Sequence, residues 1–251
     1  MSGHSKWASI KHKKGAADAA RGKVFTRHAK LIEIAAREGG GGDPDKNPQL
    51  RSAIDGAKGD NVPNNNIDRA IKKGTGELKD AAQTVAVTYE AYGPAGTAYI
   101  IECLTDNTNR TLPNVKTILM KKGGKFAEKG SVSFMFKQKG VVVADISGKD
   151  GDELELAMMD AGAEDIDRSD TTIDVTASRN GWHKVRDALK ETGCEIETAG
   201  LKYVPSQSVS ISDVDAAKKV FEFMSALEED EDVSEVHTNA DISEEVAGQI
   251  S

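Results

Sequence analysis

The residues best suited to binding chemistry lie in the first 38 positions, where cations are frequent and acids are rare. This segment holds nine Lys and Arg against three Asp and Glu, a net charge of +6 in a 251-residue chain whose total is −8. Ammonium and guanidinium groups displace the counterions of a phosphate backbone, so the pattern predicts a polyanionic partner. The candidate contacts are Lys6, Trp7, Lys11, His12, Lys13, Lys14, Arg21, Lys23, Arg27 and Lys30.

Two of these residues need separate comment. Trp7, close to the Lys11–Lys14 cluster, offers a ring that stacks on a nucleobase. It would equally serve as an anchor that packs the basic arm onto the helices, and both interpretations stay open. His12 is interpreted as a phosphate or base contact, because the sequence identifies no partner that would orient it as a general base.

The spacing of apolar residues after position 23 predicts an amphipathic helix that ends before the glycines at 39–42. Phe25, Ala29, Ile32 and Ala36 share one face, and the basic residues lie on the other. We expect the apolar face to enter a core and the basic face to meet an anion. The alternative is that the basic face is only the solvated side of a surface helix.

A second basic cluster follows on a third helix, predicted from about Pro63 to Lys73. The helix before it is expected to begin with Asn47 as its cap and Pro48 in its first turn. The third helix adds three candidate contacts, which are Arg69, Lys72 and Lys73. Favourable interaction with the helix dipole is the competing explanation for cations at this end.

The net charge of the chain changes sign near residue 80. The period of the apolar residues changes at the same place, from helical to two. Residues 1–80 hold sixteen bases and ten acids, while residues 81–251 hold seventeen bases and thirty-one acids. Beyond the boundary, Val85 to Tyr89 alternates with period two and Ala98 to Leu104 is continuously apolar, which predicts a β-hairpin. The polar run Thr105 to Thr111 then leads into a helix, and its residues would either bind a ligand or cap that helix.

The order of these elements predicts an α+β fold of three domains, a helical N-terminal domain followed by two α+β sandwich domains, the last inserted into the middle one. The hairpin would be an unfinished sheet by itself, so we expect a C-terminal segment to complete it. The predicted domains are a basic helical domain at 1–80, a discontinuous α+β domain at 81–131 and 205–239, an inserted acidic α+β domain at 132–204, and a frayed tail at 240–251.

Within the inserted domain, two strands are expected at Ser131–Phe136 and Val141–Ile146, separated by a turn at Lys137–Gly140. Between Asp145 and Asp174 there are eleven acids and only two bases. We interpret this run as a solvated face that repels phosphate and orients the basic domain toward it, rather than as a metal site.

Catalytic chemistry is not expected. The sequence has no HExxH, GxSxG or CxxC motif and no GxGxxG after a strand, so we predict no catalytic residue, metal or cofactor. A hydrolase that uses the acidic face is the alternative from another class. Cys103 and Cys194 lie in apolar contexts typical of buried thiols, which fits a reducing compartment.

Location follows from what the sequence contains. No run approaches the roughly 18 apolar residues that a membrane helix needs. The basic start lacks the apolar segment of a secretory signal, although it could pass for a short organellar targeting segment. We expect a cytoplasmic monomer that does not bind membranes.

Six motifs closely resemble the YebC/PmpR family and cover nearly the whole chain. They are GHSKWASIKHKK at 3–14, RGKVFTR at 21–27, NVPNNNIDRAIKKGTGE at 61–77, YEAYGPAG at 89–96, ECLTDNTNRT at 102–111 and GSVSFMF at 130–136. The resemblance implies a helical N-terminal domain and two α+β domains, in agreement with the pattern of elements.

The resemblance also implies a function. Members of that family are labelled probable transcriptional regulators that bind DNA. A mitochondrial relative is a translational activator of a cytochrome oxidase subunit, and some bacterial members are associated with the ribosome and the translation of proline-rich stretches. We therefore expect a non-enzymatic nucleic-acid-binding regulator, with DNA as the leading target and ribosomal RNA, for a ribosome-associated translation factor, as the alternative.

Overall fold

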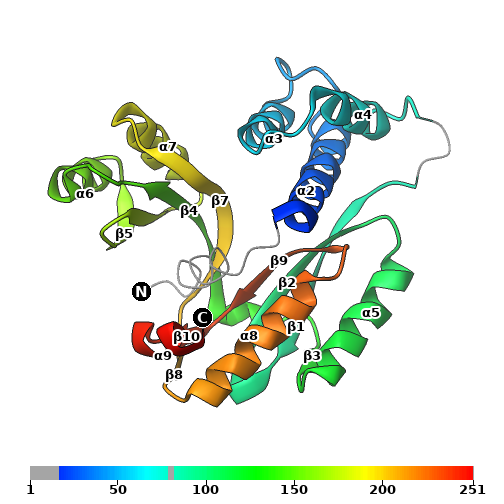
Figure 1. The fold of residues 1–251 in the computed structure, drawn as a ribbon. Coiled ribbons are helices and arrows are strands. Elements are labelled where there is room, and N and C mark those ends of the chain that lie inside the picture. The colour runs from blue at the N-terminus through cyan, green and yellow to red at the C-terminus, as the bar shows by residue number, and fades with distance from the viewer. Residues whose placement is uncertain (1–16, 79–81, 251) are drawn as a thin grey trace.

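The computed structural model describes residues 17–78 and 82–250, which form three units (Figure 1). A helical bundle comes first, and two α+β units follow, each built on a four-stranded sheet. The second α+β unit lies within the chain of the first. The predicted fold class is confirmed.

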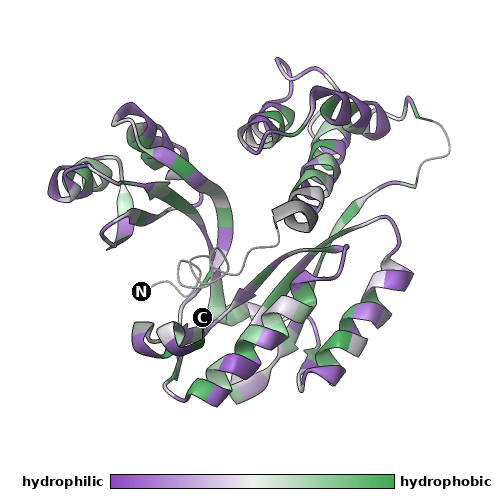
Figure 2. Ribbon diagram, viewed as in Figure 1, coloured by the Kyte–Doolittle hydropathy of each residue, from purple (hydrophilic) through white to green (hydrophobic). Residues whose placement is uncertain are grey.

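The helical bundle has a core of its own. It consists of α2 (Ala17–Glu38), α3 (Pro48–Gly59) and α4 (Asn64–Gly74). Ile32 and Ala36 of α2 are buried in this core, and Phe25 and Ala29 pack against it, so the predicted inner face of the first helix is confirmed. Figure 2 shows that apolar residues of the three helices turn toward one another.

Asn47 connects the first two helices. Its Oδ1 accepts a hydrogen bond from the N–H of Leu50 at 3.0 Å, which is the side-chain cap that the sequence predicted for α3. Its Nδ2 donates to the carbonyl oxygens of Ala35 at 2.8 Å and Gly41 at 2.9 Å. One buried amide therefore begins α3 and holds the turn that ends α2.

The central unit contains a sheet in the order β3-β1-β2-β9. Its elements are β1 (Val85–Tyr92), β2 (Ala98–Thr105), α5 (Thr108–Lys121), β3 (Lys125–Ala127), α8 (Val214–Glu228) and β9 (Val233–Thr238). Helices α5 and α8 cover one face, where Tyr99, Leu119 and Phe223 are among the fully buried side chains. The pairing of β9 with β2 completes the sheet with a strand from the far end of the chain.

The predicted frayed tail at 240–251 is wrong for residues 240–250. β10 (Ala240–Ile242) pairs in parallel with β8 (Val209–Ile211), and α9 (Glu244–Ile250) packs against α8. Ile242 and Val246 are buried in the same core as α8. A three-residue strand and a seven-residue helix carry too few apolar positions to reveal a period, so their burial depends on partners distant in sequence.

The second α+β unit has a wholly antiparallel sheet in the order β5-β6-β4-β7. Its elements are β4 (Phe136–Asp145), α6 (Gly151–Asp160), β5 (Ala163–Arg168), β6 (Thr172–Ala177), α7 (Trp182–Glu191) and β7 (Glu195–Pro205). Apolar residues of α6 and α7 pack on one face of this sheet.

Two expectations for this unit are wrong. The predicted strands Ser131–Phe136 and Val141–Ile146 are replaced by a 3₁₀ turn at Ser133–Met135 and one continuous strand, β4. Gly140 lies inside β4 because its bare Cα lets Trp182 pack against the strand, and not because the chain turns there. β5 was not expected, because half of its six residues are acidic.

Asp174 is a buried acid on β6. Its neighbours Ile173 and Val175 enter the core beneath α6 and α7, so Asp174 points to the opposite face of the sheet. The side chain has no hydrogen-bond partner among the described residues, and Asp167 is its direct cross-strand neighbour. Burial, reinforced by the charges of Asp167 and Asp165, raises the pKa of Asp174 to about 7.

We predict that Gly140→Ala destabilises the protein by about 1–3 kcal/mol, because a Cβ at this position would overlap the Cβ of Trp182. The free energy of unfolding from urea titration measures the effect. Gly200→Ala is the matched control, since it lies on the neighbouring strand β7 with no atom near its added methyl group. Equal stability of the two variants would contradict the close packing at Gly140.

We predict that Asp174→Asn changes the pH dependence of stability. The folded-state pKa is about 7 and lies above the ordinary value of 3.8, so ionisation favours the unfolded chain and the stability of the natural protein falls as pH rises from about 4 to 7. The asparagine variant lacks this loss and should gain stability over the natural protein at pH 8 but much less at pH 5. Asp170→Asn, at an exposed bend, is the control and should show no comparable gain in stability at pH 8.

Candidate nucleic-acid interface

Three cations repeat along one face of α2. Lys23, Arg27 and Lys30 are spaced by four and three residues, which places them on the same side of the helix. This side lies against the central unit, where α2 contacts β2 and an ion pair reaches β9 (Figure 1). Lys23 Nζ donates to the carbonyl oxygen of Asp230 at 2.8 Å. The basic side of α2 is therefore an interdomain contact in this structure.

Lys30 has the most complete set of partners. Its Nζ donates to the carbonyl oxygens of Leu104 at 2.7 Å and Glu231 at 3.0 Å, and to Oδ1 of Asp232 at 3.3 Å. An ammonium group has three N–H donors, so all the donors of Lys30 are engaged. Each acceptor belongs to the central unit.

Asp232 is the buried carboxylate of this contact. It also accepts hydrogen bonds from Arg110 Nη2 at 2.8 Å and from Thr111 Oγ1 at 2.8 Å. Burial opposes ionisation of Asp232, but the hydrogen bonds from Arg110 and Thr111 and the charge of Lys30 outweigh it and lower the pKa. The carboxylate is therefore ionised at neutral pH and links α2 to the first turn of α5.

The polar run that precedes α5 has a structural role. Asn107 Oδ1 accepts a hydrogen bond from the N–H of Arg110 at 3.1 Å and so caps the helix. Thr111 Oγ1, whose one proton is donated to Asp232, also lies 2.9 Å from the Asn107 carbonyl oxygen and 2.8 Å from Thr105 Oγ1. Helix capping and the contact with Asp232 thus account for the side chains of Asn107 and Thr111. Of the two predictions for this run, ligand binding or capping, the capping role is confirmed.

Glu235 on β9 joins all three units. Its Oε2 accepts from Arg27 Nη2 of the bundle at 3.2 Å, and its Oε1 pairs with Lys202 Nζ of the second α+β unit. Burial by itself would raise the pKa of Glu235, but Lys202 and Arg27 hold it at about 2. A single ionised carboxylate is therefore shared between cations from two different units.

Glu102 and His237 lie beside this carboxylate. The three side chains bring potential metal ligands within 4.8 Å of one another, the one such group in the part of the chain that the structure describes. Nε2 of His237 is 2.8 Å from Oε2 of Glu102, and Arg27 and Lys202 already neutralise Glu235. A divalent cation would meet two positive charges at contact distance, so the geometry favours a cluster of ion pairs over a metal site.

The candidate contacts of α4 fall into two groups. Arg69 and Lys72 are exposed to solvent. Lys73 instead pairs with the buried carboxylate of Glu33 at 2.9 Å, and Glu33 accepts two further hydrogen bonds, from the N–H and Oγ1 of Thr84, both at 2.7 Å. Lys73 therefore ties α4 to α2 and to the residue before β1, and only Arg69 and Lys72 face outward.

The remaining seven candidates lie wholly or partly outside the described part of the chain. Arg21 lies in α2, but its side chain is outside the described part of the chain. Six further candidates lie outside the described residues altogether, and they are Lys6, Trp7, Lys11, His12, Lys13 and Lys14.

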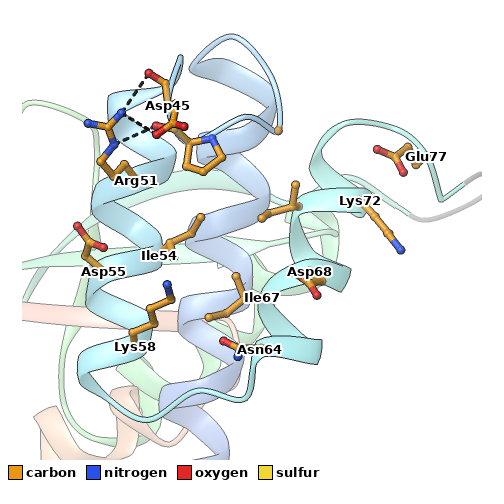
Figure 3. A pocket seen from close by; sticks show the side chains of 13 residues that line it. Asp45, Arg51, Ile54, Asp55, Lys58, Asn64, Ile67, Asp68, Lys72 and Glu77 are labelled. Carbon is orange, nitrogen blue, oxygen red and sulfur yellow. Dashed lines mark hydrogen bonds and ion pairs between the residues drawn. The ribbon is translucent and has the colours of Figure 1, made fainter.

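A groove of about 640 Å³ lies between α3 and α4 (Figure 3). Ile54 and Ile67 lie between the two helices, while Arg51 turns back to Asp45, whose carbonyl oxygen accepts from Arg51 Nη2 at 3.0 Å. The charged residues that line the groove are Asp45, Asp55, Asp68, Glu77, Arg51, Lys58 and Lys72. Because acids and bases are almost equal in number, the groove does not favour a polyanion.

The fold and the charge pattern define a class of protein, in which a basic helical bundle precedes two α+β units, one set inside the other. Family models place the chain within it. Residues 5–77 match the TACO1/YebC protein N-terminal domain, and residues 84–240 match the TACO1/YebC second and third domain. The chain belongs to the TACO1/YebC family.

Full-length relatives carry one recurrent name. A protein of Halothermothrix orenii is 46% identical over 253 residues, covering 100% of this chain and 99% of its own, and is named "Probable transcriptional regulatory protein". A protein of Thermobifida fusca with the same name is 46% identical over 251 residues, covering 100% of both chains. These names describe regulators and not an enzyme class.

A solved structure has the same fold. The crystal structure of a conserved hypothetical protein from Aquifex aeolicus matches with a TM-score of 0.83 and 38% identity, covering 90% of this chain and 93% of that one. Among the described residues, no helix is long and apolar enough to cross a membrane.

Sequence reasoning missed the acids that receive the α2 cations. Five consecutive acids at Glu228–Asp232 were visible as a charge run, but a run alone does not identify what it faces. Glu235 gave a weaker signal, a single acid in a short strand between buried Val233 and Val236. Charged residues are rarely buried unless they are paired, so an acid in such a strand indicates a nearby cation. This was the signal in the sequence that could have identified Glu235.

We predict that Glu235→Gln destabilises the protein by about 2 kcal/mol at pH 7, because Arg27 and Lys202 lose the carboxylate that neutralises them. The carboxylate's pKa is about 2 in the folded protein and 4.5 ordinarily, so its contribution is complete above about pH 5 and is lost as pH falls toward 2. The difference between the two proteins in urea unfolding should shrink accordingly.

Glu222→Gln is the control for this prediction. Glu222 is 69% exposed and pairs with Lys122 at 3.7 Å, and solvent-exposed pairs contribute only about 0–1 kcal/mol. If the two variants lost the same small amount of stability, the Glu235 cluster would not hold the units together.

Proposed function

We propose that this protein is a non-enzymatic, nucleic-acid-binding regulator, with DNA as its target in transcription, and that its basic N-terminal domain contacts the phosphates. The observation that carries the proposal is the behaviour of the cations on α2. Lys30 binds three oxygen atoms, and Lys23 and Arg27 bind oxygens on the same side of the helix. A helix face that coordinates a row of carbonyl and carboxylate oxygens suits phosphate oxygens as well.

Two further facts support the proposal. Arg69 and Lys72 present exposed charge on α4, on the same bundle as the α2 cations. Residues 81–251 carry an excess of fourteen acids, so phosphate is repelled from the α+β units and directed to the bundle. The names of the full-length relatives agree with a regulatory role.

The test is the salt dependence of binding. We predict that the affinity for duplex DNA, measured by fluorescence anisotropy over a potassium chloride series, falls steeply with salt. Replacing Arg69 and Lys72 together by alanine should lower the log–log slope by up to about 2 units, since each phosphate contact on duplex DNA contributes roughly 0.9. The loss of affinity should be similar for unrelated DNA sequences, because these residues contact the backbone.

Lys184→Ala with Lys190→Ala is the matched control, because both lysines are exposed on α7 of the acidic unit. This control should keep the natural slope. The proposal would be refuted if the affinity of the natural protein did not depend on salt, or if the two double variants had the same log–log slope. The same salt series with a ribosomal RNA hairpin distinguishes the two targets. Tighter binding to RNA than to DNA, together with co-sedimentation with ribosomes, would favour a role in translation over a role in transcription.

A further inference from the structure

The bundle is docked on the central unit by polar contacts. The apolar cluster of the bundle contains residues from Phe25 to Ile71 only, and the other apolar clusters of the described residues contain none from α2, α3 or α4. Hydrogen bonds and ion pairs therefore provide the described links between the bundle and the rest of the chain. An interface of this kind is weakened by competing charges much more than an apolar one would be.

The surface that receives α2 is rich in acids. Residues 228–232 read Glu-Glu-Asp-Glu-Asp, and Glu235 follows after two residues of β9. We name residues 228–235 the acidic segment. The oxygens that bind the three α2 cations come mostly from it, and they are the carbonyl oxygens of Asp230 and Glu231, Oδ1 of Asp232 and Oε2 of Glu235.

We propose that the acidic segment is an internal competitor for nucleic acid, which occupies the α2 face that the proposed function assigns to phosphates. This inference rests on the proposed function. Docking of α2 on the acidic segment and binding of phosphate by the α2 cations exclude each other, because the three N–H donors of Lys30 are already used. Nucleic acid binds fully only when α2 leaves the segment.

Thermodynamic linkage makes the competition measurable. A change that weakens docking without touching the α2 cations must raise the affinity for nucleic acid, and nucleic acid must weaken docking by the same factor. Bulk salt weakens both contacts and cannot distinguish them. Neutralising acids of the segment while keeping their shape weakens the electrostatic attraction that favours docking and leaves the α2 cations unchanged.

The test combines three substitutions, Glu229→Gln, Asp230→Asn and Glu231→Gln. They lower the charge of the acidic segment by three units, which weakens its attraction for the α2 cations, and leave in place the carbonyl oxygens of Asp230 and Glu231 and the carboxylates of Asp232 and Glu235. The probes are a mixed-sequence DNA duplex and a ribosomal RNA hairpin, with affinity measured by anisotropy. We expect the affinity for the polymer that the natural protein binds to rise about tenfold, within the usual range of coupled equilibria.

The matched control removes the same charge from the second α+β unit. Asp160→Asn, Asp170→Asn and Glu191→Gln are all at exposed positions of that unit. This control should change the affinity by less than about twofold, because these exposed charges lie in a different unit from the α2 cations and are screened by solvent and salt. An equal rise in the two triple variants would overturn the inference, since it would reflect general repulsion and not competition for α2.

A distance measurement supplies the reciprocal readout. Cys103 and Cys194 are buried free thiols, so spin labels can be attached at Ser52→Cys on α3 and Met120→Cys on α5, both exposed positions. We expect saturating nucleic acid to shift the distribution of interlabel distances in the natural protein. In the variant with three substitutions in the acidic segment, we expect part of the same shift in the absence of nucleic acid. Unchanged distances on saturation would overturn the inference while leaving the proposed function intact, whereas a lack of binding to both polymers would refute the proposed function itself.

Discussion

Ionised carboxylates at the contacts between the units, with Asp232 buried and Glu235 half-buried, are the constraint on which the rest of the structure depends. Removing a carboxylate from water costs several kcal/mol unless cations and hydrogen-bond donors surround it. Asp232 is stabilised by Lys30 of the bundle, and Glu235 by Arg27 of the bundle and Lys202 of the second α+β unit. Asp232 is also paired with Arg110 of its own unit, whereas both ion-pair partners of Glu235 belong to other units, so the neutralisation of Glu235 requires docking. The apolar core of the bundle stabilises the bundle itself, and charge neutralisation sets its position on the rest.

Local physics made the bundle predictable. The period of Phe25, Ile32 and Ala36 identified the inner face of α2, and Asn47 identified the start of α3, because both signals lie within one or two turns of helix. What the basic face of α2 contacts could not be predicted in the same way. Lys23 bonds to a residue 207 positions away, and a helical period indicates that a face is charged without indicating its partner. The sequence therefore predicted which face of α2 is charged, but not which residues lie against that face.

The errors in the α+β units have a related cause. A glycine in a strand and a glycine in a turn look alike in sequence, and the packing of Trp182 against Gly140 decides between them. β5 was missed because its acids resemble a solvated loop, although its backbone pairs with β6. β10 was missed because three residues carry no period, and its partner β8 is as short. In each case the deciding contact is tertiary, and no local propensity contains it.

Charge asymmetry along a chain has two physical outcomes, an external partner of opposite charge or neutralisation inside the protein. In this protein Arg27 and Lys30 of α2 are neutralised internally, by acids from the opposite end of a chain that is acidic overall. An internal partner acts at a high effective concentration, because folding holds it close. At α2, an external polyanion must displace the acids, so its net binding free energy is the difference between its own contact with the cations and the contact that the acids lose. At exposed Arg69 and Lys72 nothing is displaced, and the full free energy of the contact contributes to binding. The number of cations in a basic segment is thus an upper limit on the contacts it provides, and their accessibility determines the affinity.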